Sequence, residues 1–129
     1  MNPPSKDIVD IIQNNLSYTE GTDLFIGREP AEPDNTATVF DVPGGPAGTD
    51  LSGANENYSP VIQIRVRNRS YLDGWSEIDD IKNVLHGLGP IEQGGATYHS
   101  IKCTMEPALL DYDENGRARF VTTFNLERK

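Results

Sequence analysis

The two histidines and the single cysteine are the side chains best suited to acid–base or nucleophilic chemistry. They are His86, His99 and Cys103. A nucleophile and its base must lie within hydrogen-bond reach, yet His99 and Cys103 are four residues apart on one expected strand, which separates them by roughly 13 Å. His86 falls in the last turn of an expected helix, where a cation suits the helix dipole. The spacing predicts ordinary packing and no enzyme; a hydrolase using His86 or His99 is the enzymatic alternative.

The acidic run Asp111-Tyr112-Asp113-Glu114-Asn115-Gly116 has the D-x-D-x-N-G spacing of the first half of a calcium loop. A calcium loop also needs a bidentate carboxylate six residues after its glycine, and that position holds Thr122. Strands, not helices, are expected on both sides. The run therefore predicts a hairpin turn, whose Asn-Gly pair tolerates positive φ. A small ligand- or calcium-binding module remains the less favoured alternative.

The residue pattern does not indicate a phosphate-binding site or a zinc site. The glycine-rich stretch at residues 44–48 lies in an acidic neighbourhood and is followed by no lysine, whereas a phosphate cradle needs donors and positive potential. Zinc needs several cysteines or histidines at short spacing, and this chain has three such residues spread from 86 to 103. We therefore expect neither a cofactor nor a bound metal.

A stripe of arginines is the most unusual local feature. Arg65, Arg67 and Arg69 alternate along one face of an expected strand, and Gln63 continues the stripe. Such a face commonly pairs with carboxylates on neighbouring strands. Arginine is also favoured at interfaces, so the stripe is a candidate contact for an acidic partner, including another copy of the chain. The candidate interface comprises Gln63, Arg65, Arg67 and Arg69 together with the acidic residues Asp41, Asp50 and Glu56.

The net charge and the composition argue against several classes of protein. The chain has 129 residues and a formal net charge of −9, which argues against a dedicated nucleic-acid binder or a protein held to anionic lipid. Ten acids and two bases precede residue 65, against ten acids and nine bases from there on. One cysteine permits no intrachain disulfide, which suits a reducing cytoplasm. No apolar run approaches a membrane span, so we expect a protein that stays inside the cell that makes it.

The elements that must position these residues follow from hydrophobic periodicity. We expect an α+β fold: a mixed, mostly antiparallel sheet of about five strands with two helices packed on one face. Residues 1–129 are expected to form a single domain, with a long irregular loop at 43–60. The expected strands are 24–26, 36–42, 61–68, 96–105 and 117–126.

Each expected helix has a cap and an apolar face. Ser5 is predicted to cap the first, and Ser70, with Asp73 three residues on, to cap the second. Gly87 fits the C-terminal end of the second helix. The apolar faces are Ile8, Val9, Ile12 and Leu16 in the first helix, and Trp75, Ile78, Ile81, Val84, Leu85 and Leu88 in the second.

Several ordered segments resemble phage minor capsid proteins. The opening blocks are residues 22–30 (TDLFIGREP), 33–35 (PDN) and 39–41 (VFD). Residues 60–68 (PVIQIRVRN) follow, then a helix that ends in VLHGL and the turn DENGR with its following strand. These blocks cover most of residues 5–127 in order. The chain is similar in size and layout to tail-terminator, or tail-completion, proteins of long-tailed bacteriophages.

The resemblance implies a structural role without catalytic residues. Several copies, commonly six, would form a ring on the head-proximal end of the tail tube, stop its growth and offer a docking surface to the head connector. The protein would be made in the host cytoplasm and would become part of the neck of the virion. The implied partners are other copies, the tail tube protein and the head connector, and DNA would pass through the lumen without specific binding. The alternative is a head-completion protein on the portal side of the same joint.

A ring joint places one patch against a different patch of the next copy. The acidic first half and the arginine stripe are hypothesised to be such unlike patches. Charge reversal of all three arginines is then expected to abolish head-to-tail joining in a complementation assay. A negative lumen would also repel DNA and let it slide through.

Overall fold

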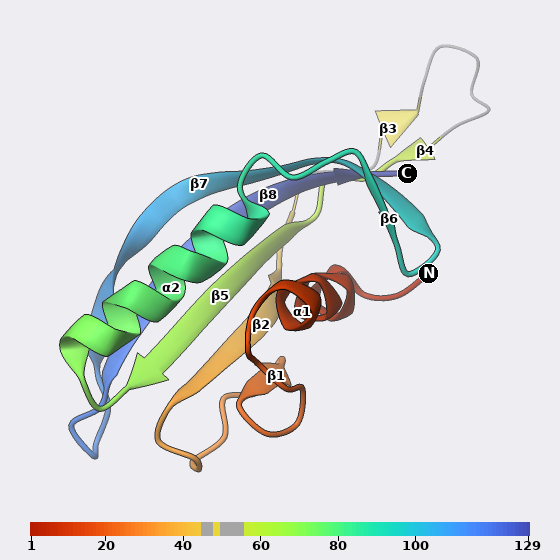
Figure 1. Ribbon diagram of the computed structural model, residues 1–129. Helices are drawn as coiled ribbons and strands as arrows, with labels where there is room; N and C mark the ends of the chain where they lie inside the picture. Colours follow the sequence, from red (N-terminus) through yellow and green to blue (C-terminus); the bar gives the residue numbers. More distant parts are fainter. Residues whose placement is uncertain (45–47, 50–55) are drawn as a thin grey trace.

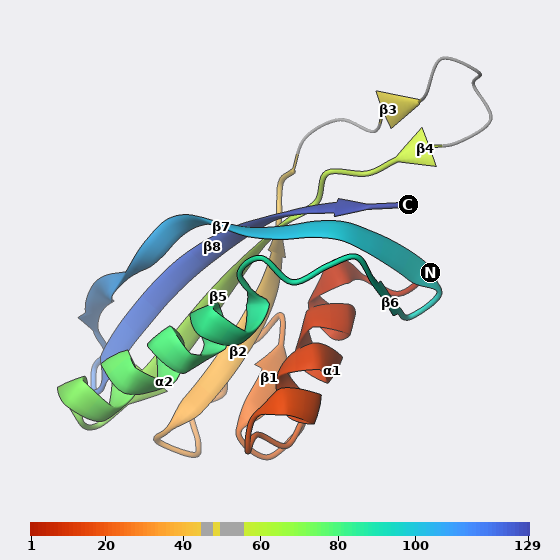
Figure 2. The same ribbon diagram turned by 45° about the horizontal axis from the view of Figure 1, so that its top comes forward.

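Two helices lie against one face of a strongly curved six-stranded sheet, as Figure 1 and the turned view in Figure 2 show. The computed structural model describes residues 1–44, 48–49 and 56–129. The α+β prediction and the placement of both helices on one face are confirmed. In chain order the elements are α1 (Pro4–Asn15), β1 (Leu24–Ile26), β2 (Thr36–Val42), β3 (Gly48–Thr49), β4 (Glu56–Asn57), β5 (Val61–Asn68), α2 (Tyr71–Leu85), β6 (Ile91–Gln93), β7 (Ala96–Tyr112) and β8 (Ala118–Arg128).

The strand order of the main sheet is β1-β2-β5-β8-β7-β6. Strand β1 runs parallel to β2, and the other neighbours are antiparallel, so the sheet is mixed and mostly antiparallel as predicted. The sixth strand is β6, which is not among the strands expected from the sequence. Its residues Ile91, Glu92 and Gln93 include one apolar side chain, so hydrophobic periodicity does not mark them as a strand. Strand β6 pairs with the start of β7 through a turn at Gly94 and Gly95, both with positive φ.

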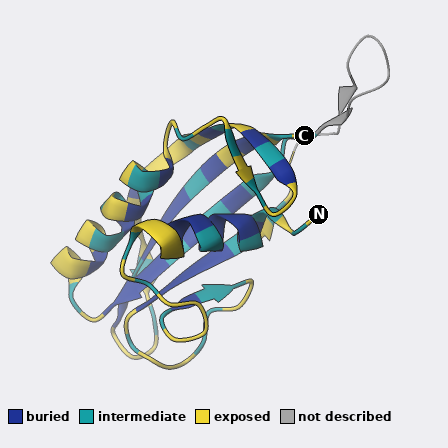
Figure 3. Ribbon diagram, turned by 45° about the vertical axis from the view of Figure 1, so that its right-hand side comes forward, coloured by how far each residue is buried: buried dark blue, intermediate teal, exposed yellow. Residues whose placement is uncertain are grey.

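Alternation along β5 and β8 builds the core. Ile62, Ile64 and Val66 are fully buried on the helix-facing side of β5, and they pair with Phe124, Thr122 and Phe120 of β8. Figure 3 shows the buried stripe beneath both helices. The apolar helix faces close over it as expected. Fully or almost fully buried helix residues are Ile8, Val9, Ile11 and Ile12 in α1 and Ile78, Ile81 and Leu85 in α2.

The expected cap of α1 is wrong in detail. The residue before the helix is Pro3, and Ser5 lies inside the first turn, where it is buried. Its backbone N–H and its hydroxyl both donate to the Asp41 carboxylate, at 3.0 and 2.5 Å. A helix start leaves unsatisfied N–H groups that some acceptor must meet. Here a side chain of β2, distant in sequence, is that acceptor, so a local pattern could not reveal it.

The expected cap of α2 is confirmed, since the Ser70 hydroxyl accepts from the Asp73 N–H at 3.3 Å. Gly87 follows the C-cap residue His86 with φ of 80°, as a helix C-terminus favours. The inclusion of Trp75 in the buried face is wrong, because this side chain is 41% exposed. Gly74 occupies the buried position instead, and a Cβ there would lie 2.7 Å from the Phe120 ring.

Strand β7 is longer and more irregular than expected. It continues through Pro107 to Tyr112, and its register against β8 shifts at four places. Because of these shifts Met105 does not share the buried face of Ile101 as predicted, and its side chain is 39% exposed. Within the expected loop at 43–60, β3 and β4 pair as antiparallel strands, and residues 45–47 and 50–55 lie outside the described residues.

Candidate assembly surface

The predicted arginine stripe lies on the sheet face opposite the helices. Gln63, Arg65 and Arg67 alternate with the buried residues of β5, and Arg69 follows just beyond the end of the strand. Arg65 remains half-buried: its Nε donates to Gln63 Oε1 at 2.9 Å, and its guanidinium lies 5.1 Å from the centre of the Phe40 ring. Of the three arginines, Arg65 is the one without a carboxylate ion-pair partner among the described residues.

Arg67 is a buried structural residue, with 2% of its surface exposed. Its guanidinium donates to the carbonyl oxygens of Pro33 and Asp34, at 2.7 and 3.1 Å, and lies 3.5 Å from the Glu29 carboxylate. Arg69 pairs with the side chain of Asp34 at 2.5 Å. Both residues therefore hold the segment between β1 and β2 against the sheet, and the carboxylates they meet belong to their own chain.

Two arginines of β8 and its preceding turn complete the same network. Arg117 contacts Asp113 at 2.7 Å, Asp34 at 3.2 Å and the carbonyl oxygen of Ala31 at 2.8 Å. Arg119 makes a two-pronged contact with Asp111 and reaches Glu29 at 3.2 Å. Alternation along β5 gives no signal of this network. Glu29 and Asp34 lie in the loop before β2, whereas Asp111 near the end of β7 and Asp113 in the turn are close in sequence to Arg117 and Arg119. We call it the charge clamp: Arg67, Arg69, Arg117 and Arg119 with Glu29, Asp34, Asp111 and Asp113.

The clamp lowers the pKa of its three aspartates. Hydrogen bonds from Arg69 lower the pKa of Asp34, and hydrogen bonds from Arg119 lower the pKa of Asp111. For Asp113 desolvation acts in the opposite direction, but hydrogen bonds from Arg117 and Asn115 outweigh it and lower the pKa. These carboxyl groups are thus ionised well below neutral pH, and their role is to satisfy arginines.

The acidic candidates from the sequence are Asp41, Asp50 and Glu56. Asp41 is exposed but bonds to Ser5 of α1, which places it on the helix-covered side of the sheet. Glu56 lies in β4, which leads into β5, and Asp50 lies outside the described residues. The structure therefore brings together Gln63, Arg65 and Phe40 on the outer face, while Asp41 lies on the helix-covered side.

His86 and Cys103 approach one another in a way the sequence analysis did not predict. The imidazole Nδ1 of His86 accepts from the backbone N–H of Cys103 at 3.0 Å. The thiol itself contacts the carbonyl oxygen of Met105 at 3.3 Å and the hydroxyl of Thr122 at 3.5 Å. The imidazole thus satisfies a backbone donor of β7, and no nucleophile–base pair results from this contact.

The acidic turn is the hairpin that the sequence predicted. Gly116 has positive φ and donates its N–H to the Asp113 carbonyl at 3.0 Å. The Asp113 carboxylate accepts from the backbone N–H groups of Asn115 and Arg117 as well as from the Arg117 side chain. Across residues 1–44, 48–49 and 56–129, no three His, Cys, Asp or Glu side chains group in a way that could hold a metal ion.

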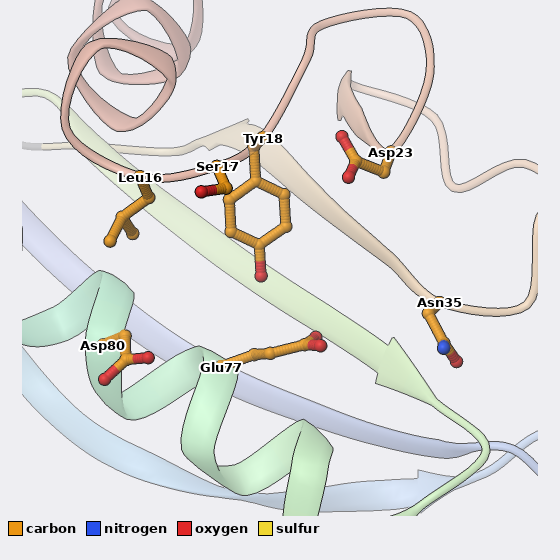
Figure 4. Close-up of a pocket in the computed structure, with 7 residues that line it drawn as sticks. All are labelled: Leu16, Ser17, Tyr18, Asp23, Asn35, Glu77 and Asp80. Atoms are coloured by element: carbon orange, nitrogen blue, oxygen red, sulfur yellow. The ribbon is translucent and has the colours of Figure 1, made fainter.

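A shallow acidic pocket of about 320 Å³ opens between the end of α1 and the middle of α2 (Figure 4). Desolvation raises the pKa of Glu77 and of the Tyr18 hydroxyl, and these two groups interact across the pocket. The Glu77 carboxylate also accepts from Asn68 at 3.1 Å, so its contacts anchor α2 to neighbouring elements. The lining residues are Leu16, Ser17, Tyr18, Asp23, Asn35, Glu77 and Asp80.

Comparison with known proteins decides the family. A family model described as "Bacteriophage tail terminator protein" matches residues 11–129, which is nearly the whole chain. The chain belongs to this tail terminator family. It is therefore a tail-associated structural protein of phage-like particles, and the earlier resemblance is confirmed.

The fold of this tail terminator family member also occurs in a particle structure. A chain in the solved structure described as "Virion of native gene transfer agent (GTA) particle" matches with a TM-score of 0.55 at 12% identity, over 94% of this chain and 83% of that one. No curated protein sequence matches the chain significantly. Within the described ranges, no helix is long and apolar enough to cross a bilayer.

Proposed function

We propose that the chain caps the head-proximal end of the tail tube as an oligomeric ring, ends tube growth and provides the surface to which the head joins. Its match to the terminator family over residues 11–129 carries this proposal. The six-stranded sheet with a clamped outer face supports it, because a joint between larger pieces needs a fixed shape. The chain would act by geometry, without transforming a substrate, and would be made in the host cytoplasm.

The contact surface proposed from the sequence is refined by the burial of its members. Arg65 and Gln63 present polar groups beside Phe40 on the outer face. Arg67 is buried, and Arg69 is bound to Asp34, so these two shape the surface from beneath and beside it. The acids Asp41, Asp50 and Glu56 are proposed as a separate acidic contact patch for a neighbouring piece of the head–tail joint. A net charge of −9 per copy would give a lumen that repels DNA.

Electron microscopy of particles assembled without the protein tests the function. We expect tail tubes of abnormal and variable length beside heads that hold DNA but carry no tail. Tubes of normal length together with leaking heads would instead assign the chain to the portal side of the joint, as a head-completion protein. Fully infectious particles without the protein would contradict both assignments.

Charge reversal at Arg65 tests the proposed contact surface. Reversal of all three arginines would also break the charge clamp, so Arg65→Glu is the sharper variant. We expect it to reduce head-to-tail joining in a complementation assay while leaving the unfolding midpoint unchanged. Lys129→Glu makes the same change of charge at another exposed base and serves as the matched control. Normal joining by Arg65→Glu would remove this face from the interface.

A further inference from the structure

The large exposed hydrophobic side chains gather in one region. Apart from Met1, those in the described ranges lie on the first two turns of α2 or on the second half of β7. Leu72 is the most exposed of them, at 75%. Contiguous apolar patches on a soluble chain commonly mark a contact site. Met105 pairs with Thr123 on the outer face of the sheet, and Leu110 stands at a register shift, so neither is placed with the helix-side residues. We call the helix-side set the apolar patch: Tyr71, Leu72, Trp75, Leu109 and Tyr112.

The helix side and the strand side of the patch meet over one buried ring. The rings of Tyr71 and Trp75 lie 5.0 and 6.3 Å from the ring of Phe120, both edge-on. Phe120 pairs in register with Leu109 of β7, and Ala118 pairs with Tyr112. An ion pair of 3.3 Å between Lys82 and Glu106 fixes the other end of α2 to the same strand. The patch is therefore continuous from α2 onto β7.

The patch lies on a strand edge that its own chain leaves open. Strand β6 pairs with β7 only as far as Tyr98. Beyond it, the N–H of Gly87 donates to the Ile101 carbonyl at 2.8 Å, and His86 accepts from Cys103. Past that point no described strand pairs with this side of β7. Register shifts here disrupt regular pairing, so a partner would dock on the side chains rather than extend the sheet.

The charges around the apolar patch indicate which kind of surface can bind to it. Asp73, Glu106 and Glu114 are exposed beside patch residues, and Asp73 and Glu114 have no basic partner among the described residues. Two patches face to face would oppose like charges, which disfavours a two-fold pair. The patch therefore fits an apolar surface that carries a free base.

The opposite edge of the same sheet offers such a surface. Strand β1 is the other edge strand. Its Leu24 is bridged by Glu20 of the preceding loop, and Ile26 packs partly against the core, whereas Phe25 is half-buried. Arg28 lies two residues beyond the end of β1 and is exposed, without an ion-pair partner in the part of the chain that the structure describes. Most other bases are already paired within the chain, including the four of the charge clamp.

We propose that the apolar patch of one copy docks on the β1 edge of the next copy, with Arg28 facing the acidic rim. Patch and acceptor lie on opposite edges of one sheet, so the contact is head-to-tail and can close into a ring. The inference rests on the proposed ring function and names the two surfaces that form its joint.

Disulfide cross-linking between copies tests the joint. In a Cys103→Ser background, Leu109→Cys and Arg28→Cys are placed in one chain, which is assembled on isolated tail tubes and oxidised. We expect a ladder of covalent oligomers that closes at the size of the ring. The pair Leu109→Cys and Lys129→Cys, whose second cysteine lies outside the β1 edge, is expected to give no ladder. Cross-linked dimers from Leu109→Cys alone would show a two-fold contact and overturn the proposal.

A charged substitution in the apolar patch tests whether the patch forms the ring joint or binds another partner. Leu72→Glu is expected to abolish ring formation in native mass spectrometry, whereas Asn83→Glu, on an exposed position of the same helix, leaves rings intact. If Leu72→Glu forms normal rings but no longer binds tubes or heads, the patch contacts those partners and the proposed joint is wrong. If wild-type rings form and the Leu109→Cys and Arg28→Cys pair cross-links, but tube lengths do not respond to the rings, the joint stands and the terminator function fails.

Discussion

One end of the sheet presents two contrasting surfaces. On the outer face, the charge clamp brings four arginines against four acids of the same chain, and Arg67 within it is almost fully buried. On the helix side, the apolar patch leaves Leu72, Trp75 and Leu109 in solvent. The sequence alone predicts Trp75 in the core and leaves two interpretations of the arginine stripe, pairing with carboxylates on neighbouring strands or contact with an acidic partner. The difference teaches that a side chain is available for contact with another protein when it has no partner within its own chain.

The largest expected effect comes from breaking the clamp. Arg67→Met removes the guanidinium that satisfies two carbonyl oxygens and faces Glu29. Because it leaves buried polar groups unpaired, we expect a loss of about 3–5 kcal/mol in the free energy of unfolding, measured by urea denaturation. Arg65→Met, on the same strand face, is the control and is expected to cost only about 0.5 kcal/mol. Equal losses would show that the clamp does not stabilise the fold.

A smaller effect is expected where α2 crosses the sheet beside the patch. Gly74→Ala places a methyl group against the Phe120 ring, whose nearest atom lies 2.7 Å from the new Cβ. Overpacking of this kind costs about 1–3 kcal/mol, although alanine favours helix. The exposed neighbour Ser76→Ala is the control and is expected to retain or slightly increase stability. A more stable Gly74→Ala protein would contradict the close approach of α2 to β8.

Acid should weaken the clamp in a defined direction. The folded-state pKa values of Asp34, Asp111 and Asp113 are lowered, so their contribution is present above the unfolded value of about 4 and is lost as the pH falls through the folded values. We expect the urea midpoint to fall between pH 5 and pH 2, measured in steps at constant ionic strength. Asp111→Asn should flatten this fall, and an unchanged pH profile would show that its pairing with Arg119 contributes no stability.

The smallest effect on folding is expected in the apolar patch. Leu72 is mostly exposed, so Leu72→Ala should change the free energy of unfolding by no more than about 0.5 kcal/mol. Thermal and urea denaturation of the isolated chain measure this. We expect substitutions in the apolar patch to reduce ring formation and to leave stability almost unchanged. Substitutions in the charge clamp, in contrast, are expected to reduce stability. A large loss of stability would mean that Leu72 serves the core.

Much of the fold could be predicted because local periodicity determines it. The alternation of Ile62, Ile64 and Val66, the Ser70 cap and the turn at Gly116 each depend on neighbouring residues, and the structure confirms them. The cap of α1 by Asp41 could not be predicted, because its partners meet only in the folded chain.

The candidate site was harder to predict for the same reason. Alternation placed Arg65 and Arg67 on one face, but it carried no information about the loop that buries Arg67. Likewise the helical period placed Trp75 in the core, while the close packing of Gly74 on Phe120 turns it outward. Contacts between distant segments decide which side chains remain available to partners.

The most direct test of the terminator account adds the purified chain to tail tube protein during polymerisation and measures tube lengths by electron microscopy. The account predicts shorter, more uniform tubes with a ring of density at one end, at a ratio of a few copies per tube. Unchanged tube lengths, or binding along the sides of the tubes, would contradict it.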